Sequence, residues 1–115
     1  MSSAHTKLLA EVLLAIGALP DAFVEKVNVV VGVNPATGQH VRSVEKGHPD
    51  IQACVRNRRT GLGLFVAGDV KTGNANLTKE QRNWRDAFIA RGGGIYRVFR
   101  SVQDAIDAIE DARNA

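Results

Sequence analysis

The chain has 115 residues, of which 44% are hydrophobic and 23% charged, with a formal net charge of +3. That length and apolar content predict one globular domain over residues 1–115 and leave no room for a second. The apolar stretches are too short to span a membrane and the N-terminus lacks the features of a signal peptide, so a soluble, cytoplasmic protein is expected. The single cysteine, Cys54, cannot form an internal disulfide and is expected in the core, and no cysteine or histidine spacing indicates zinc.

The first half of the chain predicts a helix followed by a hairpin. Apolar residues recur at helical spacing over residues 6–19, and Pro20 is expected to end that helix. Residues 27–33 are rich in β-branched side chains, and the turn sequence at residues 34–38 leads back into a second strand at residues 40–44.

The second half predicts alternating strands and helices. Strands at residues 51–55 and 62–70 form an antiparallel pair, and a helix at residues 78–91 ends at a triple glycine. A strand at residues 95–99 is expected to lie parallel to its predecessor through a right-handed crossover, before a last helix at residues 101–113. This order predicts an α/β fold with a mixed sheet of about four to five strands flanked by helices.

Two acidic residues and a lysine stand at the ends of the second strand pair. Asp50 begins one strand and Asp69 lies near the end of its antiparallel partner, so both carboxylates are expected at the same end of the sheet. Asp69 and Lys71 share a face of the strand, with Val70 pointing into the core. Carboxylates suit Mg²⁺ or Mn²⁺, and a nearby ammonium can contact a phosphate. The pattern indicates metal-dependent phosphodiester hydrolysis; ordinary surface charge is the alternative.

The helix at residues 78–91 carries one further candidate. Thr78 and Gln81 are spaced for a capping box, and Gln81, Trp84 and Phe88 share a helical face. Trp84 and Phe88 are expected in the core, which would turn Gln81 towards the acidic pair. Two roles stay open for Gln81: an N-terminal cap, or a polar contact to the attacking water or the phosphate.

Charge is unevenly distributed along the chain. Residues 51–100 hold ten basic and three acidic residues, whereas residues 101–115 hold one basic and four acidic residues. A basic surface beside an acidic metal site suits a polyanionic backbone, although chance clustering on a solvated surface gives the same count. The candidate DNA contacts are Arg56, Arg58, Arg59, Lys79, Arg82 and Arg85.

These motifs resemble the VRR-NUC branch of the PD-(D/E)xK nuclease superfamily over most of the chain, from about Glu11 to the C-terminal helix. The residues that carry the resemblance are Gly47, Pro49, Asp50, Asp69, Lys71, Gln81 and Trp84. The resemblance implies a restriction-endonuclease-like core and Mg²⁺- or Mn²⁺-dependent cleavage of DNA that leaves a 5′-phosphate and a 3′-hydroxyl. Many members of the family carry glutamate in the place of Asp69.

The resemblance also implies roles for single residues. Asp50, Asp69, the carbonyl oxygen of Val70 and a glutamate of the first helix, here Glu11, would hold one or two metal ions; an exposed helical glutamate is the alternative for Glu11. Lys71 would orient the attacking water or neutralise charge on the phosphate. Small proteins of this type are phage or bacterial homodimers that act on branched DNA, such as the Holliday junctions of DNA repair.

Two other classes of function stay open. One is a non-catalytic, basic nucleic-acid-binding module in which the acids are structural, and the other is a nuclease-fold subunit without activity of its own. No phosphate-loop or dinucleotide motif is present, so no nucleotide cofactor is expected. His5 and His40 have no partner at a useful spacing, and His48 is expected to be a loop residue near DNA.

Overall fold

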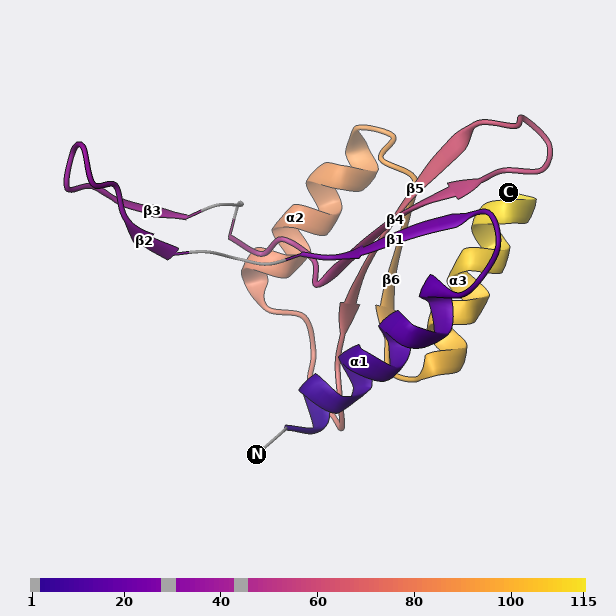
Figure 1. The fold of residues 1–115 in the computed structure, drawn as a ribbon, viewed down its shortest axis with the longest axis horizontal. Coiled ribbons are helices and arrows are strands. Elements are labelled where there is room, and N and C mark those ends of the chain that lie inside the picture. The colour runs from indigo at the N-terminus through magenta and orange to yellow at the C-terminus, as the bar shows by residue number, and fades with distance from the viewer. Residues whose placement is uncertain (1–2, 28–30, 43–45) are drawn as a thin grey trace.

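The computed structural model describes residues 3–27, 31–42 and 46–115. These residues form an α/β structure, as the predicted order of elements indicated (Figure 1). Its elements are α1 (Ala4–Gly17), β1 (Ala22–Lys26), β2 (Val31–Val33), β3 (His40–Arg42), β4 (Ile51–Arg56), β5 (Gly63–Val70), α2 (Lys79–Ala90), β6 (Ile95–Phe99) and α3 (Val102–Asn114). Among the described residues, no helix has both the length and the apolar character that a membrane crossing requires.

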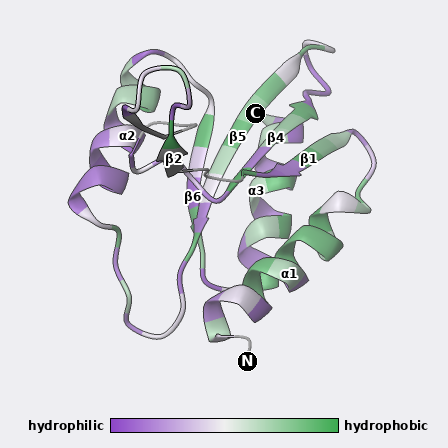
Figure 2. Ribbon diagram, turned by 60° about the vertical axis from the view of Figure 1, so that its left-hand side comes forward, coloured by the Kyte–Doolittle hydropathy of each residue, from purple (hydrophilic) through white to green (hydrophobic). Residues whose placement is uncertain are grey.

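A mixed four-stranded sheet organises the molecule, with strand order β1-β4-β5-β6. β4 is antiparallel to β1 and β5, whereas β6 is parallel to β5. A parallel neighbour requires a crossover, and α2 provides it. Figure 2 shows the result: α2 lies on one side of the sheet and α1 and α3 lie on the other. The expected pairing of β4 with β5 and the parallel β6 are both confirmed.

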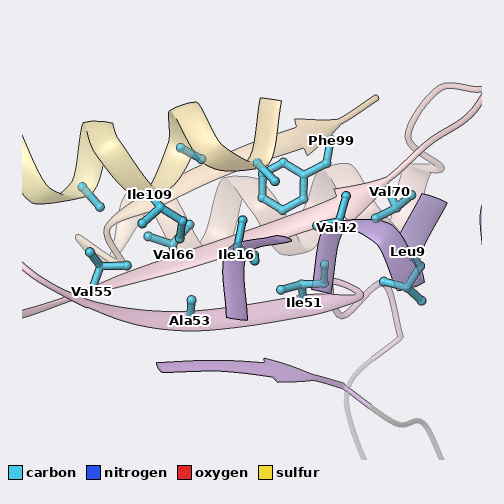
Figure 3. Close-up of a cluster of buried hydrophobic side chains, with 13 residues drawn as sticks. Leu9, Val12, Ile16, Ile51, Ala53, Val55, Val66, Val70, Phe99 and Ile109 are labelled. Atoms are coloured by element: carbon cyan, nitrogen blue, oxygen red, sulfur yellow. The ribbon is translucent and has the colours of Figure 1, made fainter. Parts of the chain in front are cut away.

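The core lies between the sheet and the helices α1 and α3 (Figure 3). Alternate residues of a strand face opposite sides, and the positions of β4 and β5 that face α1 and α3 are apolar. α3 contributes mostly small side chains, which let it pack closely against the strands. The buried members are Leu9, Val12, Ile16, Ile51, Ala53, Val55, Val66, Val70, Phe99, Ala105, Ala108, Ile109 and Ala112.

The opposite face of the sheet is only partly covered. α2 lies over its β5–β6 half, where Phe88 contacts Phe65 with a ring-centroid distance of 5.4 Å. Over β1 and β4 the face is open, since the Phe23 side chain is 68% exposed and Cys54 is exposed. The prediction that Cys54 belongs to the core was therefore wrong: strand alternation turns it away from its buried neighbours Ala53 and Val55.

The first half of the chain differs from its prediction in two places. α1 ends at Gly17, before Pro20, and Asp21 with φ 65° turns the chain directly into β1, which was not predicted. Of the strand predicted at residues 27–33, the described part is β2, which pairs antiparallel with β3, as the predicted hairpin requires, in a two-stranded sheet separate from the main one. Residues 28–30 and 43–45, which belonged to the predicted hairpin, lie outside the described residues.

Candidate active site

Asp50 and Asp69 lie together at the end of the β4–β5 pair. Ile51 is opposite Gly68 in the register, so the next positions along the two strands are the two aspartates. The Asp50 N–H donates to Asp69 Oδ1 at 3.3 Å, and the Val70 N–H donates to Asp50 Oδ2 at 2.9 Å. Each carboxylate thus accepts a main-chain hydrogen bond from the opposite strand, which extends the ladder and holds the two acids side by side.

Asp69 is a fully buried carboxylate that hydrogen bonds to neutral side chains. Its exposed fraction is 0%, the Tyr96 hydroxyl donates to Oδ2, and Gln81 Nε2 donates to Oδ1 at 3.4 Å. Among the ion pairs of the described residues, none includes Asp69. Burial raises the pKa of Asp69 above its ordinary value, and the charge of Asp50 raises it further, against the lowering by the Tyr96 hydrogen bond. A cation at this place would stabilise the charged carboxylate.

Tyr96 stays protonated beside Asp69. Its own burial raises the pKa of the phenol well above the ordinary range, and the hydrogen bond and charge of Asp69 add to that shift. The phenol therefore keeps its proton at neutral pH, and its hydroxyl donates to Asp69. Nothing in the sequence patterns pointed to Tyr96, since it meets Asp69 across the parallel β5–β6 pair, 27 residues along the chain.

Gln81 forms the predicted N-terminal cap and also contacts Asp69, whereas its predicted contact to the attacking water or the phosphate stays a prediction. Its Oε1 accepts from the Thr78 N–H at 2.9 Å, and its own N–H donates to Thr78 Oγ1 at 3.2 Å, which completes the capping box. Because Oε1 is used by the cap, Nε2 is the atom that faces Asp69. The start of α2 is thereby tied to the acidic pair by one side chain.

Gly47 explains why the loop before Asp50 lies against α2. It has φ +86°, and a Cβ atom there would stand 2.2 Å from the carbonyl oxygen of Glu80. Only glycine allows that approach without displacing the helix backbone. One residue later the His48 ring contacts Trp84, with a centroid distance of 5.2 Å. The glycine of the motif therefore sets the position of Asp50 relative to the first turn of α2.

Lys71 follows directly on β5. Its main-chain N–H donates to the Phe99 carbonyl oxygen at 3.1 Å, and its side chain is half-buried. Its positive charge lowers the pKa of Asp69, although less than burial raises it. The Lys71 charge thus acts on Asp69 electrostatically, and Val70, which lies between these two residues in the chain, is buried, as predicted.

The first helix approaches the acidic pair through His5 and not through Glu11. His5 Nε2 lies 3.3 Å from Asp50 Oδ2, so the prediction that His5 has no partner was wrong. Glu11 is exposed, with 48% of its side chain accessible, and pairs with Lys7 at 4.0 Å, one helical turn earlier. The structure therefore does not bring Glu11 to Asp50 and Asp69.

The oxygen atoms of Asp50, Asp69 and Val70 suit a hard divalent ion as ligands. Within residues 3–27, 31–42 and 46–115, no group of three or more histidine, cysteine and acidic side chains is arranged to hold a metal ion. Asp50 and Asp69 remain as a pair, and the Asp50 side chain is 29% exposed, which gives access from solvent. Mg²⁺ commonly uses one or two carboxylates and keeps several waters or phosphate oxygens, so the pair and the nearby Val70 carbonyl oxygen fit such an ion.

The six candidate DNA contacts fall on two separate surfaces. Lys79, Arg82 and Arg85 lie on the first two turns of α2, beside the acidic pair. The other three lie at the far end of the β4–β5 pair, roughly 20 Å away for a strand of six residues. There Arg58 donates to Asn114 Oδ1 at 3.1 Å and Arg59 donates to the Ala115 carbonyl oxygen at 3.4 Å, while Arg56 ends β4. The basic stretch of the sequence is therefore not one patch.

Comparison with known proteins yields no relative of this chain: no family model, no curated protein and no solved structure matches it. The resemblance to VRR-NUC proteins rests on the motif residues and stays a prediction.

Proposed function

We propose that the chain is a metal-dependent DNA endonuclease. The observation that supports this proposal is the pair of carboxylates Asp50 and Asp69, interlocked across two strand ends. Asp69 is fully buried and takes part in none of the ion pairs of the described residues, while the Asp50 side chain contacts His5 and stays 29% exposed. Gln81 donates to Asp69, and the positive charge of Lys71 lowers the pKa of Asp69. Burial and the charge of Asp50 raise the pKa of Asp69, and a carboxyl perturbed by burial together with a specific charged neighbour marks a candidate functional site.

The chain's residues divide the work of hydrolysis. Asp50 and Asp69 would hold the ion, and Tyr96 and Gln81 keep the Asp69 carboxylate oriented. When bound, Mg²⁺ or Mn²⁺ supplies Lewis acidity at the phosphate and lowers the pKa of water. The Lys71 ammonium contacts a phosphate oxygen and stabilises the charge that develops there. The oxygen of water bonds to phosphorus and loses a proton to solvent, while the bond to the 3′ oxygen breaks and that oxygen takes up a proton from solvent. The products are a 5′-phosphate and a 3′-hydroxyl.

The substrate, partner and compartment follow from the resemblance. Branched DNA such as a four-way junction is the proposed substrate, in the cytoplasm of a bacterial or phage-infected cell. A homodimer is the proposed assembly, because a two-fold axis presents two sites to two strands.

A non-catalytic DNA-binding module is the second candidate. The complete burial of Asp69 favours it, since a carboxylate that only extends a strand ladder needs no access to substrate. In that case Lys79, Arg82 and Arg85 contact the backbone, and binding weakens steeply with salt but does not require divalent metal.

The test is cleavage of labelled four-way junction, splayed duplex and linear duplex in Mn²⁺, Mg²⁺ or EDTA. Asp69→Asn and Lys71→Gln are compared with matched changes of exposed residues, Asp111→Asn and Lys7→Gln. The proposal expects metal-dependent cutting that is lost in the first two variants and kept in the two controls. Metal-independent binding without cutting, equal in all four variants, would establish the binding module instead.

A further inference from the structure

A groove of about 610 Å³ runs between α2 and the loop before β4, outside the acidic pair. The proposed hydrolysis uses none of the side chains that face it. Its principal lining residues are Lys46, Glu80, Asn83, Trp84, Phe88 and Arg91.

An aromatic stack forms the apolar part of this groove. Trp84 and Phe88 were predicted to lie in the core, yet no residue of α2 is fully buried. Their rings stack with a centroid distance of 5.0 Å and an interplanar angle of 17°. This stack remains partly open to solvent, and it includes the one tryptophan of the chain.

The polar rim of the groove carries the groups that a nucleotide requires. Lys46 and Arg91 supply positive charge, and both are exposed. Lys46 pairs with Glu80 at 3.3 Å, but the two side chains are 69% and 41% exposed, so the pair is weak and exchangeable. The Asn83 amide, exposed beside Trp84, can donate to and accept from the edge of a base.

The groove adjoins the acidic pair through α2 itself. Trp84 contacts Tyr96, with a centroid distance of 6.4 Å, and Tyr96 donates to Asp69. Gln81, one turn before Trp84, also donates to Asp69. A strand whose phosphate lies at the acidic pair therefore passes the groove within the length of a nucleotide or two.

We propose that this groove binds an unpaired nucleobase of the DNA strand held at the acidic pair. His48 and Phe65 contact these two rings on other sides, so the base lies against the parts of Trp84 and Phe88 that line the groove, and the flanking phosphate lies near Lys46 or Arg91. Bases of an intact duplex are already stacked on their neighbours, so the groove selects DNA with an unpaired base beside the scissile bond, as in a branch or a frayed end. The statement that a bond beside the bound base is cleaved rests on the proposed nuclease function. Base binding itself requires no cleavage.

The fluorescence of Trp84 tests base binding directly, because no other tryptophan contributes. The full chain, in EDTA to prevent cleavage, is titrated with a single-stranded thymidine oligonucleotide and with an abasic oligonucleotide of equal length and charge. Stacking predicts saturable quenching by the first and much weaker quenching by the second. Equal responses to the two, or unchanged emission at saturation, would overturn the proposal and leave only backbone attraction or a different occupant such as a peptide.

Variants supply a second measurement, by fluorescence anisotropy of a labelled oligonucleotide. Trp84→Ala should weaken single-strand binding about 5- to 100-fold, the usual effect of losing one aromatic–base stack, whereas Trp84→Phe should keep most of it. Phe23→Ala is the matched control, since Phe23 is 68% exposed on β1, away from the groove, and should not change affinity. If Trp84→Ala does not fold, Trp84→Phe and the abasic comparison still decide.

The two proposals fail separately. Cleavage of branched DNA without discrimination against abasic strands would overturn the groove and leave the nuclease intact. Base-dependent quenching without any metal-dependent cleavage would keep the groove as a nucleobase site and overturn the nuclease.

Discussion

Tyr96→Phe removes one hydroxyl from the centre of the candidate site and leaves the ring in place. The lost bond is the donation to Asp69 Oδ2. Tyr96 is 9% exposed and Asp69 is 0% exposed, so water has no ready access to replace the donor. A hydrogen bond to a charged group contributes about 1.5–3 kcal/mol to the free energy of unfolding, and the acceptor left behind stays buried.

The expected loss of unfolding free energy corresponds to a decrease in the melting temperature. Unfolding entropy near the midpoint is about 2.1 cal/mol/K per residue, which for 115 residues is about 0.24 kcal/mol/K. A loss of about 1.5–3 kcal/mol therefore lowers the melting temperature by about 6–12 °C at neutral pH.

The loss should depend on pH in a defined direction. Burial holds the pKa of the Asp69 carboxyl above its ordinary value of 3.8. The contribution of Asp69 to the free energy of unfolding is therefore fully present below about pH 4 and is lost as pH rises through the raised pKa. The Tyr96 hydrogen bond lowers that pKa and so limits the loss. Without it the pKa of Asp69 rises further, and the variant should fall behind the parent protein most at pH 7 to 8 and least near pH 4.

Thermal unfolding followed by circular dichroism at half-unit steps from pH 4 to pH 8 measures this difference. A double-mutant cycle with Asp69→Asn isolates the pair, because the Tyr96→Phe change should cost less once the acceptor is uncharged. A loss that is the same at pH 4 and pH 8, or unchanged by Asp69→Asn, would refute the reasoning.

Two further predictions concern the same region. Gly47→Ala should destabilise the protein by at least about 2 kcal/mol and impair cleavage, because the added Cβ atom would stand 2.2 Å from the carbonyl oxygen of Glu80. Gly38→Ala is the control: Gly38 has φ +72° and no atom within 4 Å of an added Cβ, so this change meets only backbone strain. Chemical denaturation of the two variants compares them, and equal losses would mean that contact with α2 is not the cause. Tyr96 is the only tyrosine of the chain, so the ultraviolet absorbance of ionised phenol reports this side chain alone. Its ionisation should begin well above pH 10 and coincide with unfolding. Ionisation near pH 10 in the folded protein would contradict the burial of Tyr96 beside Asp69.

Local rules were enough to locate the acidic pair from the sequence. Strand alternation and antiparallel pairing act over neighbouring segments, and the Asp50 and Asp69 positions are separated by 19 residues joined through one hairpin. The capping box of α2 is more local still, since Thr78 and Gln81 lie within one helical turn. Such features follow from backbone geometry and require no knowledge of how the layers pack.

Packing decided the rest of the site. His5 reaches Asp50 across 45 residues, because the apolar face of α1 fixes how that helix lies on the sheet, and the same rotation turns Glu11 to solvent. Tyr96 reaches Asp69 only once α2 has carried the chain back to a parallel strand. Helical and strand periodicity indicate which face of an element is apolar. They do not indicate which neighbour this face contacts or which polar residues come to lie along its edge, because both depend on how the whole core is buried.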